Sequence, residues 1–226
     1  MKKSEGGSNG LGSNGKDRLA ILRTVGVALL MGATSTAALA AGAFDEQLAF
    51  DPEAYETLSV MLDGEAVDVR RYEVVYVGKP VEMAPVQPSR GVGPGGQPDS
   101  GEGRPLEDPL SMHKMIVYVP DAAVENDDSA IILHVSNSGW FASPVTDRVE
   151  NGGEYSSTSD TDPIGAALKA GYVVVSAGTR SRSALAADDT FAGKAPAPVV
   201  DAKAAIRYLR LNDAVMPGSS ERIVIT

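Results

Sequence analysis

The chain has 226 residues, of which 43% are hydrophobic and 22% are charged, the proportions of an ordinary globular protein. Its formal net charge of -10 opposes binding to phosphate backbones, so we expect no nucleic-acid partner. It contains no cysteine, which excludes disulfide bonds, thiolate metal ligands and a cysteine nucleophile.

Residues 1–40 have the features of a secretory signal peptide. Basic residues precede a short apolar stretch at 24–33, and Ala38-Leu39-Ala40 is a small-x-small cleavage site, with cleavage after Ala43 as the alternative. A transmembrane anchor needs about 20 apolar residues, and this stretch is shorter and interrupted by small and polar residues. We therefore expect a secreted or periplasmic protein without a stable membrane anchor after cleavage.

Two β-rich runs, 58–62 and 67–77, flank Asp63-Gly64. Asp-Gly between two such runs is a strong signal for a β-hairpin. The following stretch, 84–109, is rich in proline and glycine and cannot bury much apolar surface. It is predicted to be a loop on the outside of the protein.

The remaining pattern alternates between apolar strands and short helices. This alternation predicts an α/β fold with a mostly parallel sheet, preceded by the antiparallel hairpin. In chain order, strands are predicted at 115–120 and 130–135, a helix at 164–170, a strand at 172–177, a helix at 201–211 and a strand at 221–226.

Five segments occur together in a characteristic order: 114–120, 132–140, 170–182, 200–210 and 222–226. In this order and spacing they resemble the N-terminal part of secreted α/β-hydrolase esterases, most closely the bacterial subtype B tannase and feruloyl esterase family. The resemblance covers roughly residues 50–226. It implies that residues 41–226 are the N-terminal part of an α/β-hydrolase-type catalytic domain, incomplete at the C-terminus.

The resemblance also implies a chemistry. Members of the family cleave carboxylic esters through an acyl-serine intermediate, and galloyl or feruloyl esters are the small-molecule substrates expected here. The serine stands on a sharp Gly-x-Ser-x-Gly turn after a strand such as 221–226, and the acid and histidine follow it in the chain. All three catalytic residues are therefore expected beyond Thr226, and the 226-residue chain alone is expected to be inactive. No metal or organic cofactor is implied.

Two groups of residues are candidates for a site within this chain. Gly139 and Trp140, in the loop after strand 130–135, can supply a backbone N–H to the oxyanion hole, although an ordinary glycine turn remains the alternative. Arg180 and Arg182 follow strand 172–177 at its carboxyl end, where α/β sheets bind ligands. Either arginine can hold a substrate carboxylate or phenolate, or can simply tie loops together.

Other titratable residues have simpler interpretations. His113 and His134 precede any nucleophile turn and do not fit the triad base, so both are predicted to be structural. A set of acidic residues has oxygen ligands suited to calcium, but its spacing matches no metal loop, and a solvated acidic loop is expected. These residues are Asp147, Glu150, Asp160 and Asp162.

Two other functional classes stay open. One is a general carboxylesterase, lipase or serine peptidase built on the same fold. The other is a non-catalytic secreted binding protein or a degenerate gene product. The second class meets a physical objection, because the strand 221–226 would be left with an open apolar edge, and such edges promote aggregation.

Overall fold

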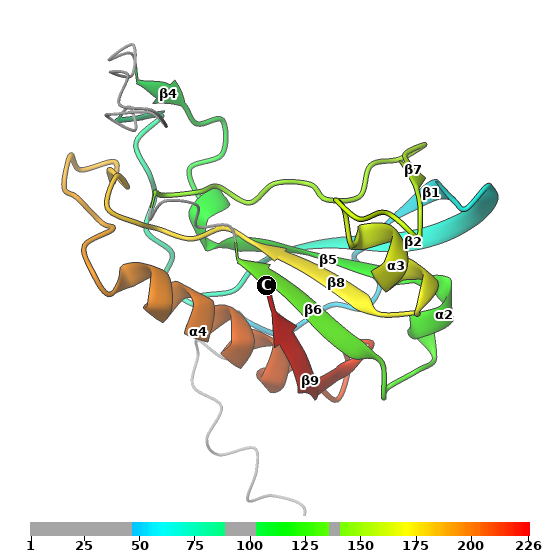
Figure 1. Cartoon of the computed structure of the whole chain (residues 1–226). Coiled ribbons are helices and arrows are strands. Elements are labelled where there is room, and N and C mark those ends of the chain that lie inside the picture. The colour runs from blue at the N-terminus through cyan, green and yellow to red at the C-terminus, as the bar shows by residue number, and fades with distance from the viewer. Residues whose placement is uncertain (1–46, 89–102, 136–140) are drawn as a thin grey trace, which may run out of the picture. The chain divides into compact units, whose positions relative to one another are not determined.

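A computed structural model describes residues 47–88, 103–135 and 141–226 (Figure 1). The centre of this part is a seven-stranded sheet with the strand order β7-β1-β2-β5-β8-β6-β9. The signal peptide expected at 1–40 lies outside the described residues. Within the three described ranges, no helix is long and apolar enough to cross a membrane.

The sheet begins with the predicted hairpin of β1 (Glu56–Leu62) and β2 (Glu65–Val75), which pair antiparallel. The two residues between them have positive φ angles, 51° at Asp63 and 84° at Gly64. Positive φ at both central residues is the mark of the tight turn that matches the twist of two antiparallel strands. The prediction from Asp-Gly is therefore confirmed. A short strand, β7 (Glu154–Tyr155), adds to the outer side of β1 in parallel.

Four strands form the other half of the sheet: β5 (Lys114–Pro120), β6 (Ala130–Val135), β8 (Val173–Ala177) and β9 (Ser219–Ile225). β6 lies between β8 and β9 and is parallel to both, whereas β5 is antiparallel to β2 and to β8. The sheet is thus mixed, and the prediction of a mostly parallel sheet is wrong at β5. The physical reason is the short connection from β5 to β6, because a parallel crossover needs a dozen or more residues.

Two helices cover opposite faces of the sheet (Figure 1). Helix α4 (Ala197–Leu211) packs Ala205, Tyr208 and Leu209 in one core cluster with Leu133 and Val175. Helix α3 (Ile164–Lys169) belongs to a second cluster that includes Val174. Neighbouring residues of one strand point to opposite faces of the sheet, so Val174 and Val175 belong to different core clusters. The apolar run of β8 follows from this burial on both sides.

Helix α4 begins at Ala197, four residues before the predicted start. Pro198 lies in its first turn. Proline is tolerated there because its missing N–H would have no partner within the helix. Helix α3 ends before Gly171, which has a φ of 69°, a conformation that glycine adopts at low cost.

The proline- and glycine-rich segment 84–109 is partly anchored in the interior. Gln87 is 1% exposed, and its side-chain amide donates to the carbonyls of Ala84 and Leu185 at 2.8 and 2.9 Å. The prediction of an outside loop therefore fails at its beginning, and residues 89–102 lie outside the description. Two short strands belong to this region, β3 (Val86–Gln87) and β4 (Arg104–Pro105). The 3-10 turn η1 (Ser111–His113) precedes β5, and a single helical turn, α2 (Asp121–Val124), follows it.

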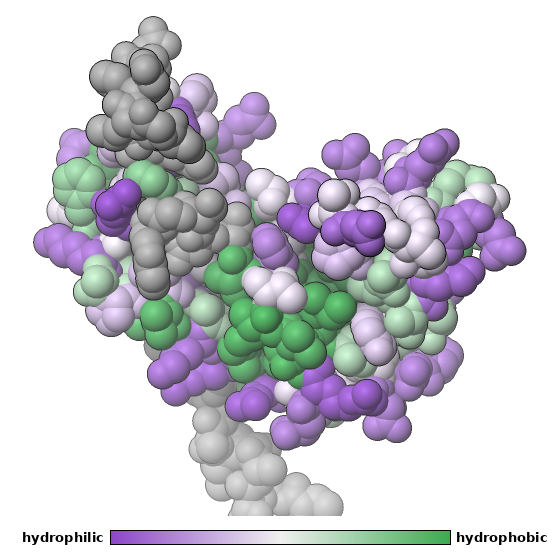
Figure 2. Space-filling view, viewed as in Figure 1, coloured by the Kyte–Doolittle hydropathy of each residue, from purple (hydrophilic) through white to green (hydrophobic). Residues whose placement is uncertain are grey.

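Strand β9 is at the edge of the described sheet and pairs only with β6. Val224 and Ile225 of this strand are 55% and 56% exposed. Figure 2 shows apolar surface gathered over β6 and β9. The open apolar edge that the sequence predicts is present in the described structure.

Candidate functional site

The loops that follow β6 and β8 lie at the same end of the sheet, the end where both strands finish, because these two strands are parallel neighbours. Ser143 and Thr179, one from each loop, exchange both backbone hydrogen bonds: the Ser143 N–H donates to the Thr179 carbonyl at 3.0 Å, and the Thr179 N–H donates to the Ser143 carbonyl at 2.9 Å. The two loops are therefore joined at the end of the sheet where α/β proteins bind ligands. We take this end of the sheet as the candidate site.

The two oxyanion-hole candidates, Gly139 and Trp140, lie outside the described residues. The segment immediately after them is held in place. Ala142 donates its N–H to the Ser183 hydroxyl at 3.3 Å, one residue before the Ser143–Thr179 pair. The chain leaving the candidate oxyanion loop is thus fixed to the loop after β8.

Arg180 has its guanidinium engaged by Asp201 of α4. Its Nη2 lies 2.7 Å from one carboxylate oxygen and its Nε lies 3.0 Å from the other, and its backbone N–H donates to the same carboxylate at 2.8 Å. Asp201 is 1% exposed. This two-pronged geometry is the strongest form of an arginine–carboxylate pair. Arg180 therefore ties the loop after β8 to α4.

His113 completes this buried network. Its Nδ1 accepts a hydrogen bond from the Val81 N–H at 3.0 Å, and its Nε2 lies 3.7 Å from Asp201 Oδ1. Burial raises the pKa of Asp201, but the contacts with His113 and Arg180 outweigh it, and the net pKa is below the ordinary aspartate value. The prediction that His113 has a structural role agrees with these contacts.

Arg182 has different surroundings. It is exposed, and its guanidinium carbon lies 4.3 Å from the centre of the Phe141 ring. No hydrogen bond or ion pair joins its guanidinium to the part of the chain that the structure describes. Of the two arginines predicted as substrate ligands, only Arg182 has a guanidinium without a hydrogen-bond acceptor among the residues that the structure describes. A substrate role for either arginine stays a prediction.

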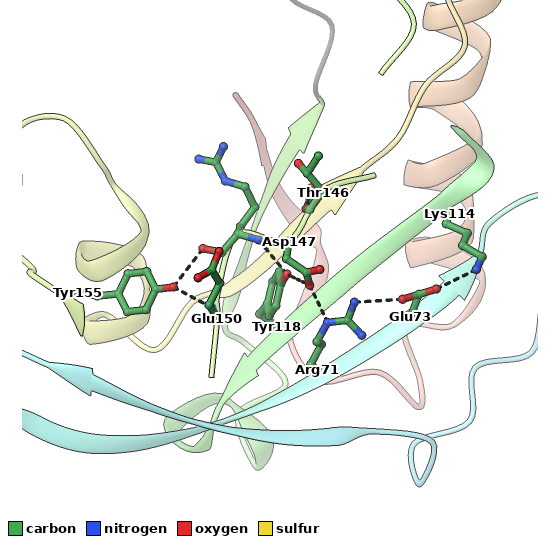
Figure 3. A network of polar contacts seen from close by, with 10 residues as sticks. Arg71, Glu73, Lys114, Tyr118, Thr146, Asp147, Glu150 and Tyr155 are labelled. Atoms are coloured by element: carbon green, nitrogen blue, oxygen red, sulfur yellow. Dashed lines mark hydrogen bonds and ion pairs between the residues drawn. The ribbon is translucent and has the colours of Figure 1, made fainter. Parts of the chain in front are cut away.

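A second polar group, missed by sequence reasoning, lies on the α3 face over β2 and β5 (Figure 3). Lys114 pairs with Glu73 at 2.8 Å and with Asp108 at 2.7 Å, and Glu73 pairs with Arg71 at 3.0 Å. The hydrogen bond from Lys114 lowers the pKa of Glu73. The signal for it was the spacing of Arg71 and Glu73, which places both side chains on one face of a strand.

The same network continues into the loop after β6. Arg71 Nε donates to Asp147 at 2.8 Å, and the Tyr118 hydroxyl donates to the same carboxylate oxygen at 2.9 Å while accepting the Arg148 N–H at 2.9 Å. Burial raises the pKa of Tyr118 to about 12. A cavity of about 440 Å³ lies beside these residues. Three of its charged lining residues, Arg71, Glu73 and Asp147, are paired with one another, so we interpret the network as a scaffold for the loop.

The acidic residues considered for calcium do not gather around one point. Asp147 is bonded by Arg71 and Tyr118, and Asp162 accepts the N–H of Ile164 at 3.0 Å at the start of α3. No group of three or more potential metal ligands occurs among the residues that the structure describes.

No protein-family model matches the chain, and no curated protein does so significantly. Solved structures do match. A tannase from Lactobacillus plantarum is 27% identical with a TM-score of 0.56, over 79% of this chain and 33% of that protein. A tannin acyl hydrolase in complex with ethyl gallate is 26% identical with a TM-score of 0.52, over 80% of this chain and 35% of that protein. The Fusobacterium nucleatum tannase, at 24% identity and a TM-score of 0.53, shares the fold.

These similarities and the α/β architecture define the described part of the chain as a partial α/β-hydrolase. More narrowly, it is tannase-like, as the sequence resemblance predicts. The chain spans about a third of the length of the tannases that it matches.

Proposed function

We propose that this chain is the N-terminal part of the catalytic domain of an exported esterase that hydrolyses galloyl or feruloyl esters. The observation that carries the proposal is the match to tannin acyl hydrolases, among them a complex with ethyl gallate, over 80% of this chain. The match covers only 35% of that protein. Most of the catalytic machinery of such an enzyme would therefore come from residues outside this chain.

In the proposed reaction, a serine made nucleophilic by a histidine attacks the ester carbonyl, and the alcohol leaves as an acyl-serine forms. Water then attacks the acyl-serine, releases the phenolic acid and restores the serine. Backbone N–H groups stabilise the oxyanion of each tetrahedral intermediate. This chain would contribute one of these donors, from Gly139 or Trp140.

Two structural features support that placement. Strand β6, which leads into the loop, lies between two parallel neighbours, and the segment after the loop is fixed by the Ser143–Thr179 pair. Donors that are already in place need little rearrangement when charge develops on the substrate, and the described segments on both sides of residues 136–140 are anchored. Arg182, on the adjoining loop, is the residue that we propose as a ligand for a phenolate or carboxylate of the substrate.

The test compares the 226-residue chain with the protein made from the gene read in frame beyond Thr226. Methyl gallate, methyl ferulate and a p-nitrophenyl alkanoate are offered to both. We expect turnover only by the longer protein, faster on the two phenolic esters, and lost when its Gly-x-Ser-x-Gly serine is replaced by alanine. Turnover confined to the alkanoate would identify a general carboxylesterase. Turnover by the 226-residue chain itself would contradict the proposed location of the nucleophile.

Export is a separate part of the proposal. It is supported by the basic, apolar and small-residue pattern of residues 1–40. Expression in a bacterial host followed by N-terminal sequencing of the periplasmic and culture fractions tests it. We expect a new N-terminus at Ala41 or Phe44, whereas an uncleaved cytoplasmic product would refute it.

A further inference from the structure

The outer edge of strand β1 is covered by the segment 151–155, which includes β7 (Figure 1). Asn151 and Gly152 take the place of a neighbouring strand at Ser59. Asn151 Oδ1 accepts the Ser59 N–H at 2.8 Å, and the Gly152 N–H donates to the Ser59 carbonyl at 2.8 Å. Both backbone groups of Ser59 are therefore satisfied on the side away from β2, whereas an open edge would present them to other chains.

Asparagine before glycine is a chemically reactive pair. Glycine has no side chain to hinder the approach of its backbone nitrogen to the Cγ atom of the asparagine. The Gly152 nitrogen loses its proton and bonds to Asn151 Cγ, ammonia leaves from that carbon, and a five-membered succinimide remains. Water then opens the succinimide at one of its two carbonyls and gives aspartate or isoaspartate. Water is the only reagent that the conversion needs.

The position of this pair in the fold decides whether it reacts. Between residues 47 and 226, Asn151 is the only asparagine that precedes a glycine, and its side chain is exposed. The Gly152 nitrogen is not a free nucleophile while its N–H is bonded to the Ser59 carbonyl. The bond from the Ser59 N–H to Oδ1 also holds the side-chain amide in place. Both reacting groups are thus engaged by the same residue.

We propose that Asn151 is a deamidation site that the folded protein holds back through Ser59. The reaction proceeds from the fraction of molecules in which this edge of β1 has opened locally. Local openings of this kind need less free energy than global unfolding. The inference is independent of ester hydrolysis, because the modification is measured without turnover.

The two products differ in their effect on the edge of β1. Aspartate keeps a carboxylate oxygen where Asn151 Oδ1 accepts the Ser59 N–H. Isoaspartate carries the backbone through the side chain and lengthens it by one methylene, just before a closely packed turn. The Gly153 carbonyl accepts the Met61 N–H at 2.9 Å, and a Cβ atom at Gly153 would lie 2.9 Å from the Glu150 carbonyl. The longer backbone therefore displaces the covering segment from β1 and exposes the edge.

The first test measures deamidation of the purified 226-residue chain at mildly alkaline pH, with and without denaturing urea. Peptide mass spectrometry quantifies the loss of Asn151, and enzymatic methylation quantifies isoaspartate. We expect the reaction to be at least tenfold slower in the folded chain than in urea. Equal rates in the two conditions would overturn the proposal, because the fold would then give no protection.

A matched pair of variants isolates the contact with Ser59. Ser59→Pro removes the N–H that Asn151 Oδ1 accepts, at an outward position of an edge strand where proline is tolerated. Ser59→Ala keeps that N–H and changes only an exposed side chain. We expect Ser59→Pro to deamidate at least fivefold faster than the native chain and Ser59→Ala to match the native rate.

Two results with these variants would contradict the proposal. Equal rates in Ser59→Pro and Ser59→Ala would show that the contact does not restrain Asn151. A slower reaction in Ser59→Pro would show that this N–H promotes the reaction by stabilising the oxyanion of the intermediate. Circular dichroism checks that both variants are folded, and the comparison of the native chain with and without urea decides the proposal even if Ser59→Pro fails to fold.

The effect on the edge has its own control. Asn151→Asp has the charge of both products and a normal backbone, so it should self-associate no more than the native chain. The isoaspartate fraction of aged protein should self-associate at least threefold more in static light scattering. Equal association of that fraction and Asn151→Asp would refute the exposure of the β1 edge.

Discussion

Asp201 and Arg180 form a two-pronged ion pair that joins helix α4 to the loop after β8, with the closest N–O distance at 2.7 Å. The carboxylate is 1% exposed, while the arginine side chain is 18% exposed. The beginning of the loop after β8 is therefore attached at two points. Thr179 bonds to Ser143 in the loop after β6, and Arg180 bonds to Asp201 in helix α4. Four predictions follow from this and other contacts.

Replacing Asp201 by asparagine should destabilise the protein strongly. The substitution leaves Arg180 without its counter-charge, and breaking a buried pair in this way costs about 3–5 kcal/mol. For a domain of this size that corresponds to a fall in Tm of about 10 °C. Differential scanning calorimetry measures it, with Glu125→Gln, at an exposed acidic residue, as the control. An equal Tm for the two variants would show that the pair contributes nothing to stability.

Stability should also fall as the pH is lowered below about 4.5. The pKa values of Asp201, Glu73 and Asp108 are all below their ordinary values in the folded protein. The unfolded chain therefore binds more protons than the folded chain in this range, and unfolding becomes more favourable as the pH falls. Urea midpoints measured between pH 7 and pH 3 test this. The native chain should lose more than Asp201→Asn, and a midpoint that rises toward pH 3 would reverse the sign and refute the argument.

Tyr118→Phe should cost about 1–3 kcal/mol, because it leaves the Arg148 N–H without its acceptor and removes a donor to Asp147. The Tyr118 side chain is fully buried, so water cannot easily replace the lost hydroxyl. Tyr172→Phe is the matched control, since Tyr172 is 37% exposed. Chemical denaturation measures both. Equal midpoints would show that the network of Figure 3 does not stabilise the loop after β6.

Val224→Lys should reduce self-association of the 226-residue chain without lowering its Tm. The lysine would place a charge on the exposed apolar edge of β9, the device by which natural sheets keep their edges from pairing. Static light scattering against concentration measures the effect. Val86→Lys, at a residue that is 52% exposed elsewhere, is the control. If both lysines reduce association equally, net charge rather than the edge is responsible.

The sequence predicted those elements whose local signals agree with their tertiary surroundings. The hairpin is an example, because Asp63-Gly64 determines both the turn and the pairing of the two strands. The position of β5 between β2 and β8 was not predictable from its own residues, because β8 comes some 50 residues later in the chain.

For the candidate site, the sequence likewise predicted the position of residues but not their partners. The position of Arg180 and Arg182 after a buried strand indicated the end of the sheet that carries the candidate site, and both residues lie in the loop after β8 in the structure. Their different surroundings depend on partners distant in the sequence, Asp201 for one and Phe141 for the other. No local pattern carries that information, because Arg180 meets Asp201 only when α4 packs on the sheet, and Arg182 meets Phe141 only when the loops after β6 and β8 come together.

The place of β6 between β8 and β9 has a consequence for how the protein is made. Both of its partners are synthesised after it, and β9 begins about 80 residues later. At the usual rate of synthesis, about 5–20 residues per second, β6 would wait roughly 4–16 seconds for its second neighbour. During that interval the apolar residues Ile131 and Leu133 would be open to a chaperone or to another nascent chain. The order of strands in the sheet thus leaves β6 dependent on protection while the chain is still growing.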